Sequence, residues 1–131
     1  MTTLKENDLN QFIGDLVRYR HPLNRKVIYT PGVRHVAEAG EAYWLIDAIA
    51  SWYGSDAFNE AAAKDDRIND WHTWTLTVGE DNAATLRAKA DSPDDAFIVQ
   101  TIPFTDFPLS SIDICAGNDG EHWTLYLPSE H

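Results

Sequence analysis

Residues 71–78, which read WHTWTLTV, decide the fold class. From His72 onward every second position carries an imidazole, aromatic or aliphatic side chain, and the positions between hold Trp71 and three threonines. A period of two, built from aromatic and β-branched residues, predicts a strand with one buried face. The chain changes to this period at residue 71 and returns to it in most of the segments that follow.

More strands are predicted downstream, separated by short polar turns. They cover residues 84–90, 96–102, 112–115 and 122–127. The stretch 103–108 begins and ends with proline, so it cannot continue a central strand. No helical pattern lies between these strands, and parallel pairs need connections of a dozen or more residues, so we expect an antiparallel meander.

The residues before 71 favour helices and one hairpin. A spacing of three and four between apolar residues predicts helices at 5–17 and 41–53, and a third, alanine-rich helix begins at Ser55 or Asp56 and runs to about residue 64. We expect residues 26–29 and 34–37 to pair across a type II turn, because proline and glycine occupy its two central positions.

These elements define an α+β fold. We expect an antiparallel β-meander of about five strands plus an N-terminal hairpin, with two or three helices packed on one face. The 131 residues, of which 44% are hydrophobic, are enough for one core, so residues 1–131 are taken as a single domain.

Negative charge is distributed unevenly. The net charge is −11, and residues 1–54 contribute none of it, since they hold six acidic and six basic side chains. Residues 55–131 hold fifteen acidic and four basic ones. Such a surface repels the phosphate backbone, so we expect no direct binding to nucleic acid.

The compartment is predicted to be the cytoplasm. Cys115 is the only cysteine, which excludes an internal disulfide. The first residues have no apolar signal-peptide core, and no apolar run approaches the roughly 20 residues of a membrane span. We therefore expect no membrane association.

One segment is positively charged, although the protein as a whole is acidic. Residues 16–37 carry five lysines or arginines and no acidic residue. Two interpretations remain open: these cations neutralise the acidic remainder within the fold, or they form an anion site. Asp47, on an otherwise apolar helix, and Asp106, between two prolines, need partners such as Arg18 or Arg20 if they are buried. The candidate binding residues are Tyr19, Arg20, His21, Arg25, Tyr43, Trp44, Asp47 and Asp106.

No catalytic or metal-binding motif stands out. The acidic run 65–70 fails as a calcium loop, because Arg67 occupies an alternate ligand position. The five histidines never pair at helical spacing. Cys115 reads as a buried, inert thiol. We therefore predict no catalytic residues, no metal and no cofactor.

Several short motifs occur in a fixed order along the chain. They lie at residues 19–21, 23–27, 29–30, 32–33, 42–47, 49–50, 103–109 and 127–130. As a set they resemble an uncharacterised family of small bacterial proteins, often encoded on plasmids and other mobile elements. The resemblance spans nearly the whole chain and supplies no catalytic residues. It implies a role in mobile-element biology.

Three functional hypotheses follow. The first is a non-enzymatic acidic protein that docks on a basic protein surface, as a nucleic-acid mimic that inhibits a host defence complex would. The second is a small ligand-binding domain or enzyme that uses residues 18–25 with His21 and Asp47 or Asp106. The third is a homo-oligomer with exposed tryptophans such as Trp52 or Trp71 at its interface.

Overall fold

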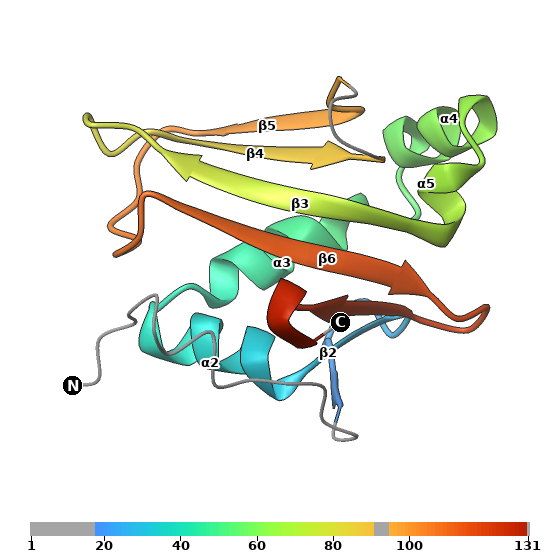
Figure 1. Cartoon of the computed structure of the whole chain (residues 1–131), viewed down its shortest axis with the longest axis horizontal. Helices are drawn as coiled ribbons and strands as arrows, with labels where there is room; N and C mark the ends of the chain where they lie inside the picture. The colour runs from blue at the N-terminus through green and yellow to red at the C-terminus, as the bar shows by residue number, and fades with distance from the viewer. Residues whose placement is uncertain (1–17, 91–94, 131) are drawn as a thin grey trace.

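The computed structural model describes residues 18–90 and 95–130, and these residues form a seven-stranded sheet with helices. Figure 1 labels most of these elements. They are β1 (Tyr19–Arg20), β2 (Val27–Tyr29), α2 (Pro31–Ala39), α3 (Tyr43–Trp52), α4 (Asp56–Lys64), α5 (Arg67–Asp70), β3 (Trp71–Val78), β4 (Ala84–Lys89), β5 (Ile98–Ile102), β6 (Ser111–Asn118), β7 (Trp123–Tyr126) and the 3₁₀ turn η1 (Pro128–Glu130). The predicted helix at 5–17 lies outside the described residues.

The α+β class and the mostly antiparallel sheet are confirmed, but the strand order differs from a simple meander. The order is β1-β2-β7-β6-β3-β4-β5. The connection after β5 returns the chain to the free side of β3, so β6 pairs with β3 rather than with β5. The pairing of β2 with β7 is parallel. Strand β3 thus lies near the middle of the sheet. This position agrees with the burial of every second side chain along most of the strand.

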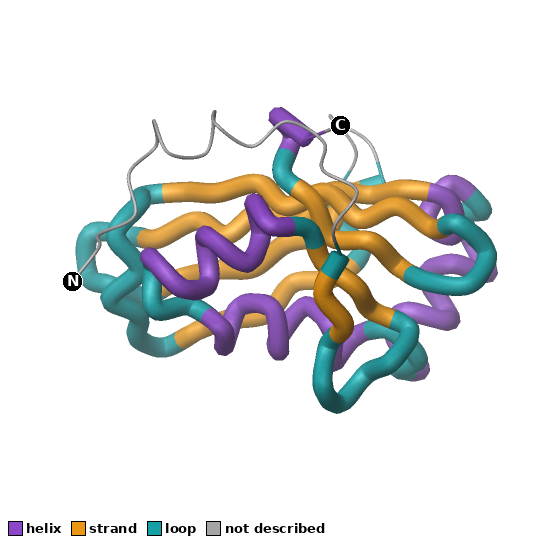
Figure 2. Tube along the Cα trace, turned by 90° about the horizontal axis from the view of Figure 1, so that it is seen from below, coloured by secondary structure: helices purple, strands orange, loops and turns teal. Residues whose placement is uncertain are grey.

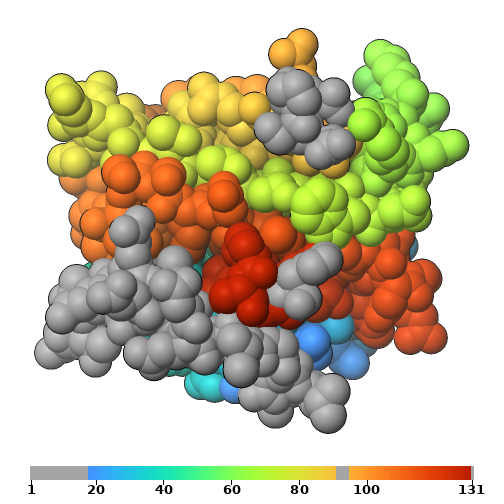
Figure 3. Space-filling model, viewed as in Figure 1, coloured from blue at the N-terminus to red at the C-terminus, as the bar shows by residue number. Residues whose placement is uncertain are grey.

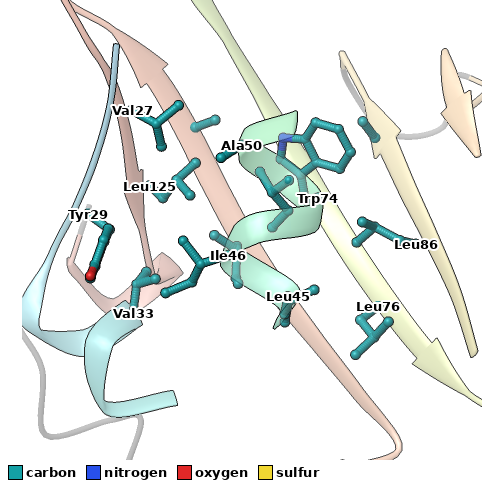
Figure 4. Close-up of a cluster of buried hydrophobic side chains, with 14 of the residues drawn as sticks. Val27, Tyr29, Val33, Leu45, Ile46, Ala50, Trp74, Leu76, Leu86 and Leu125 are labelled. Carbon is teal, nitrogen blue, oxygen red and sulfur yellow. The ribbon is translucent and has the colours of Figure 1, made fainter. Parts of the chain in front are cut away.

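The helices α2 and α3 cover one face of the sheet (Figure 2). Helix α3 supplies the centre of the core, because Leu45, Ile46 and Ile49 are all nearly inaccessible to solvent. In Figure 4 the side chains of α3 point toward those of β3, β4 and β7, including Trp74, Leu86 and Leu125. The prediction of a central, largely apolar helix at 41–53 is confirmed.

The predicted second arm of the hairpin, residues 34–37, is wrong, because these residues belong to α2. Thr30 is the N-cap of that helix, its hydroxyl accepts a hydrogen bond from the Val33 N–H, and Pro31 occupies the first helical position. Threonine followed by proline is as typical of a helix start as of a turn. An N-terminal hairpin does form, between β1 and β2.

Smaller differences concern the acidic run and the strand ends. Residues 67–70 of the acidic run form the one-turn helix α5, for which no helix was predicted. The helix at Asp56–Lys64 is confirmed, with Ser55 as its N-cap. Strand β6 is longer than predicted and extends from Ser111 to Asn118.

The face of the sheet opposite α2 and α3 is polar. It carries the alternate residues of the strands, among them Thr73, Thr75 and Thr77 of β3 and Arg87 of β4. Figure 3 views this face, with residues of β3 in yellow-green and of β4 in gold at its surface. Among the described residues, no helix has the length and apolar character needed to cross a membrane.

Candidate functional site

His21 and Asp47, two of the predicted site residues, are in direct contact. The loop between β1 and β2 places the buried imidazole of His21 beside α3, where its Nε2 lies 2.8 Å from the Asp47 carboxylate. The Nδ1 of His21 accepts the backbone N–H groups of Leu23 and Asn24, at 3.2 and 2.9 Å. Nδ1 is therefore unprotonated, and Nε2 donates its proton to Asp47.

Asn24 attaches the same loop to the end of α3. Its side-chain amide donates to the carbonyl oxygens of Ala50 and Tyr53, at 3.0 and 3.3 Å. Carbonyl groups at a helix C-terminus have few partners within the helix. Asn24 adds a second donor to the Ala50 carbonyl, which also accepts the Tyr53 N–H at 3.3 Å, and supplies a donor to the Tyr53 carbonyl. Together His21 and Asn24 clamp the loop to α3. The partner of Asp47 is thus His21 rather than the Arg18 or Arg20 expected from sequence.

The geometry of His21 favours a structural role over acid–base chemistry. A histidine that acts as a general base needs one ring nitrogen directed at the reacting group while the other is oriented by a partner. Here Nε2 faces Asp47, and Nδ1 faces two backbone N–H groups. A shallow cavity of about 490 Å³ adjoins the clamp and is lined by the exposed Arg25 as well as by His21 and Asp47.

Tyr19 and Tyr43 belong to a second polar cluster, which is centred on Arg34. The Arg34 guanidinium lies 4.6 Å from the centroid of the Tyr19 ring and donates to the Tyr19 hydroxyl at 2.9 Å. Glu38, one helical turn further along α2, accepts from Arg34 and from the Tyr43 hydroxyl. This cluster ties β1 to α2 and α3. Arg34 and Glu38 were not among the predicted site residues.

The other predicted site residues do not converge on the clamp. Arg20 is exposed on the short strand β1, and Trp44 is half-buried against the core. Asp106 is exposed in the connection from β5 to β6, where the neighbouring Thr105 N–H donates to the carbonyl of Asn82 in the turn after β3. The proposed grouping of Asp106 with His21 therefore stays a prediction without geometric support.

A buried hydrogen-bond chain runs beneath the sheet. The His72 Nδ1–H donates to the Ile68 carbonyl at 3.0 Å, so its Nε2 accepts from the Tyr53 hydroxyl, at 2.7 Å. The Tyr53 oxygen in turn accepts from the indole of Trp74 at 2.9 Å. Burial lowers the pKa of His72 to about 4 and raises that of Tyr53, so both side chains are neutral at physiological pH. Every polar side-chain atom in this series of hydrogen bonds has a partner, which suits a structural role.

A second buried network joins the C-terminal end to α2, and sequence reasoning missed it. The carboxylate of Glu130 accepts from the Thr30 hydroxyl at 2.6 Å, from the Gly32 N–H at 3.3 Å and from the Leu127 N–H at 2.9 Å. An acidic side chain is favourable at a helix N-terminus, where N–H groups lack partners. The only signal in the sequence was a glutamate in the terminal LPSE motif.

The described residues contain no group of three or more histidine, cysteine or acidic side chains that could hold a metal ion. Cys115 is buried, and burial raises the pKa of its thiol, which keeps it in the unreactive protonated form.

The negative charge gathers at the two ends of the sheet. At one end lie α4, α5, the residues between them and the turn 118–121, which carry seven acidic and two basic side chains. We call this group the acidic end (Figure 1, right). The side chain of Asn118 donates to the carbonyl of Asn69 at 2.8 Å and holds the turn against α5.

Local hydrogen bonds keep members of the acidic end ionised. Backbone N–H groups of His122 and Glu121 lower the pKa of Asp119, and Arg67 lowers that of Asp65. The opposite end carries Glu80, Asp81 and Asp106, without a basic residue in either of the two segments that hold them. Strands β3 to β7 hold a single acidic residue, Asp113, so the excess charge of the C-terminal part lies in its helices and turns rather than on the sheet.

The architecture defines a class of α+β proteins in which helices cover one face of a seven-stranded, mostly antiparallel sheet. The chain belongs to a family of unknown function, DUF6876, whose model matches residues 3–131. This confirms the resemblance to an uncharacterised family. Comparison with curated proteins and with solved structures gives no match.

Proposed function

We propose that the protein is a non-enzymatic interaction protein whose acidic end docks on a basic protein surface. The observation that carries the proposal is the convergence of seven acidic side chains from α4, α5 and the turn 118–121, against only two basic ones. A concentration of one charge sign accelerates encounter with an oppositely charged partner and makes binding sensitive to salt.

The partner is a protein whose basic surface binds nucleic acid. Closely spaced carboxylates on a rigid scaffold imitate the charge of a phosphate backbone, and a protein built to bind phosphates recognises both. The resemblance to proteins encoded on mobile elements favours a host defence complex as that partner. The second candidate function, a ligand site at His21, has less support because both ring nitrogens are already engaged.

Charge-reversed variants test the proposal. One variant carries Asp66→Lys, Asp70→Lys and Glu121→Lys at the acidic end, and its matched control carries Glu80→Lys, Asp81→Lys and Asp106→Lys at the opposite end. Both change the net charge equally. Proteins captured from bacterial lysate by the unaltered chain should be released by salt and lost from the first variant but retained by the second. Capture that both variants share equally, or no salt-released partner, would contradict the proposal.

A further inference from the structure

The polar face of the sheet contains a groove that neither the clamp nor the acidic end uses. Its floor is formed by Trp71, Thr73, Thr75 and Thr77 of β3, and Arg87 and Lys89 of β4 form one side. The volume is about 440 Å³, within the range of small-molecule sites, which is roughly 300–1,000 Å³. We call it the threonine groove.

The cations of the groove are not neutralised. Arg87 and Lys89 are two positions apart on β4, so their side chains project from the same face, and they lie opposite Thr75 and Thr73 on β3. Neither forms a hydrogen bond or an ion pair with any other residue that the structure describes. In a chain with a net charge of −11, two adjacent cations without an acidic partner indicate a place for an external anion.

Asp113, on the other side of β3, does not supply that anion. Its carboxylate accepts the hydroxyl hydrogen of Thr75 at 2.6 Å, directly across the pairing of β3 with β6. No ion pair links Asp113 to Arg87 in the described part of the chain. The groove therefore has a positively charged side at β4, with two cations, and a side at β6 with the single carboxylate of Asp113, which is hydrogen-bonded to Thr75.

Trp71 provides a planar surface at one end of the groove. Its indole Nε1–H donates to the hydroxyl of Tyr126 at 2.6 Å, which limits rotation of the ring, and 37% of the residue remains exposed. A fixed, partly exposed indole is suited to stacking against a planar ring.

We propose that the threonine groove binds a mononucleotide, with its phosphate on Arg87 and Lys89 and its base against Trp71. Arginine and lysine are the usual phosphate-binding side chains. Threonine hydroxyls can donate hydrogen bonds to, and accept them from, the polar groups of a sugar or a base. A long polynucleotide is disfavoured, because its other phosphates would approach the acidic ends of the sheet. The proposal is independent of the acidic end and of its partner.

Calorimetric titration of the full chain tests the assignment. AMP and GMP are the probes. Two fragments serve as controls: adenosine, which lacks the phosphate, and ribose 5-phosphate, which lacks the base. Both nucleotides should bind more tightly than either fragment, and binding should weaken as salt is added. The double variant Arg87→Gln, Lys89→Gln and the single variant Trp71→Leu should each weaken AMP binding about tenfold or more.

Arg25→Gln is the matched control, since Arg25 is an exposed cation that lines the separate cavity beside His21. It should leave AMP binding unchanged, and thermal unfolding verifies that every variant is folded. No heat of binding with millimolar AMP or GMP overturns the proposal. So does binding that the groove variants leave intact, equal affinity for AMP and ribose 5-phosphate, or tighter binding of a single-stranded oligonucleotide than of AMP.

Discussion

His72 links pH to stability at the scale of one residue. Its imidazole is inaccessible and surrounded by rings, with Trp123 and Phe97 centred 4.9 and 5.3 Å away. Burial lowers its pKa from 6.5 to about 4, so the unfolded chain binds a proton between these values and the folded chain does not. The contribution of His72 to the free energy of unfolding is fully present above pH 6.5. It is lost as the pH drops toward 4, which lowers the free energy of unfolding by about 3 kcal/mol in total.

Urea denaturation from pH 7 to pH 4 checks this expectation when the chain is compared with His72→Gln. The variant should be less stable at pH 7 but should lose less stability on acidification. Nitrogen chemical shifts of His72 give an independent reading, since the ring should remain neutral at pH 5 with its proton on Nδ1. Equal pH slopes for the two proteins, or a doubly protonated ring at pH 5, would contradict the assignment.

The clamp gives a second prediction at this scale. Asp47→Ala removes the acceptor of the buried His21 Nε2–H and should cost about 1 kcal/mol of unfolding free energy. Asp47→Asn keeps an acceptor oxygen at the same position and should cost less than half as much. The neighbouring Ser51→Ala, which alters only an exposed hydroxyl, is the control. Equal losses for the alanine and asparagine variants would mean that the carboxylate does not serve as this acceptor.

The sequence grouped His21 with either Asp47 or Asp106 but could not choose between the two carboxylates. Asp47 stood out as a charged residue on an apolar helix, and His21 as part of a polar loop. The contact spans 26 positions in the chain and depends on how the loop meets α3. Arg34 and Glu38 were missed because residues 34–37 were predicted to be a strand that ends before Glu38. Only in a helix do residues four apart, such as these two, become neighbours.

At the scale of elements, Gly32 and Glu130 determine how the chain end meets α2. A Cβ on Gly32 would lie 2.5 Å from a Glu130 carboxylate oxygen and 2.9 Å from a methyl carbon of Leu127. Gly32→Ala should therefore destabilise the protein by about 1–3 kcal/mol through overpacking. Gly117→Ala is the matched control, because its new Cβ would meet the rings of Tyr126 and Trp71 only at ordinary contact distances, 3.6 and 3.9 Å, and should cost little.

A double-mutant cycle shows whether the carboxylate is the obstacle. Glu130→Ala leaves three donors without their acceptor and is destabilising by itself. Combined with Gly32→Ala it also removes the close contact, so the two losses should sum to more than the loss in the double variant. Strict additivity in thermal or urea unfolding would indicate that Gly32 and Glu130 act separately.

The elements differ in how far sequence could define them. The alternation of β3 and the apolar face of α3 were readable, since each depends on a period repeated over eight or more residues. Residues 30–33, with the sequence TPGV, were ambiguous, because proline and glycine are typical of a turn, whereas threonine followed by proline is typical of a helix start. What decides for the helix is the contact with Glu130, which is distant in sequence. The pairing of β6 with β3 was equally hidden, because turn residues do not specify the edge to which a chain returns.

At the scale of the molecule, the two acidic ends are separated by the length of β3. Eight residues at about 3.3 Å each span about 26 Å, whereas the screening length is about 10 Å at 0.1 M salt. Repulsion therefore acts mainly within each end. Adding salt to a dilute buffer should raise the unfolding temperature by weakening this local repulsion.

Single charge reversals should reproduce the salt effect locally. Asp66 and Asp70 lie four positions apart at α5, where like charges repel, and Asp70 also occupies the unfavourable C-terminal turn. Asp70→Lys should stabilise the protein by roughly 0.5 kcal/mol in dilute buffer and reduce its dependence on salt. Glu80→Lys at the opposite end should do the same, because Glu80 is exposed there, while Arg87→Glu on the sheet should have the reverse effect.

Because the ends lie more than two screening lengths apart, the gains of Asp70→Lys and Glu80→Lys should add in thermal unfolding at 0.1 M salt. Gains that fail to add would mean that the molecule responds to its total charge rather than to the charge within each end.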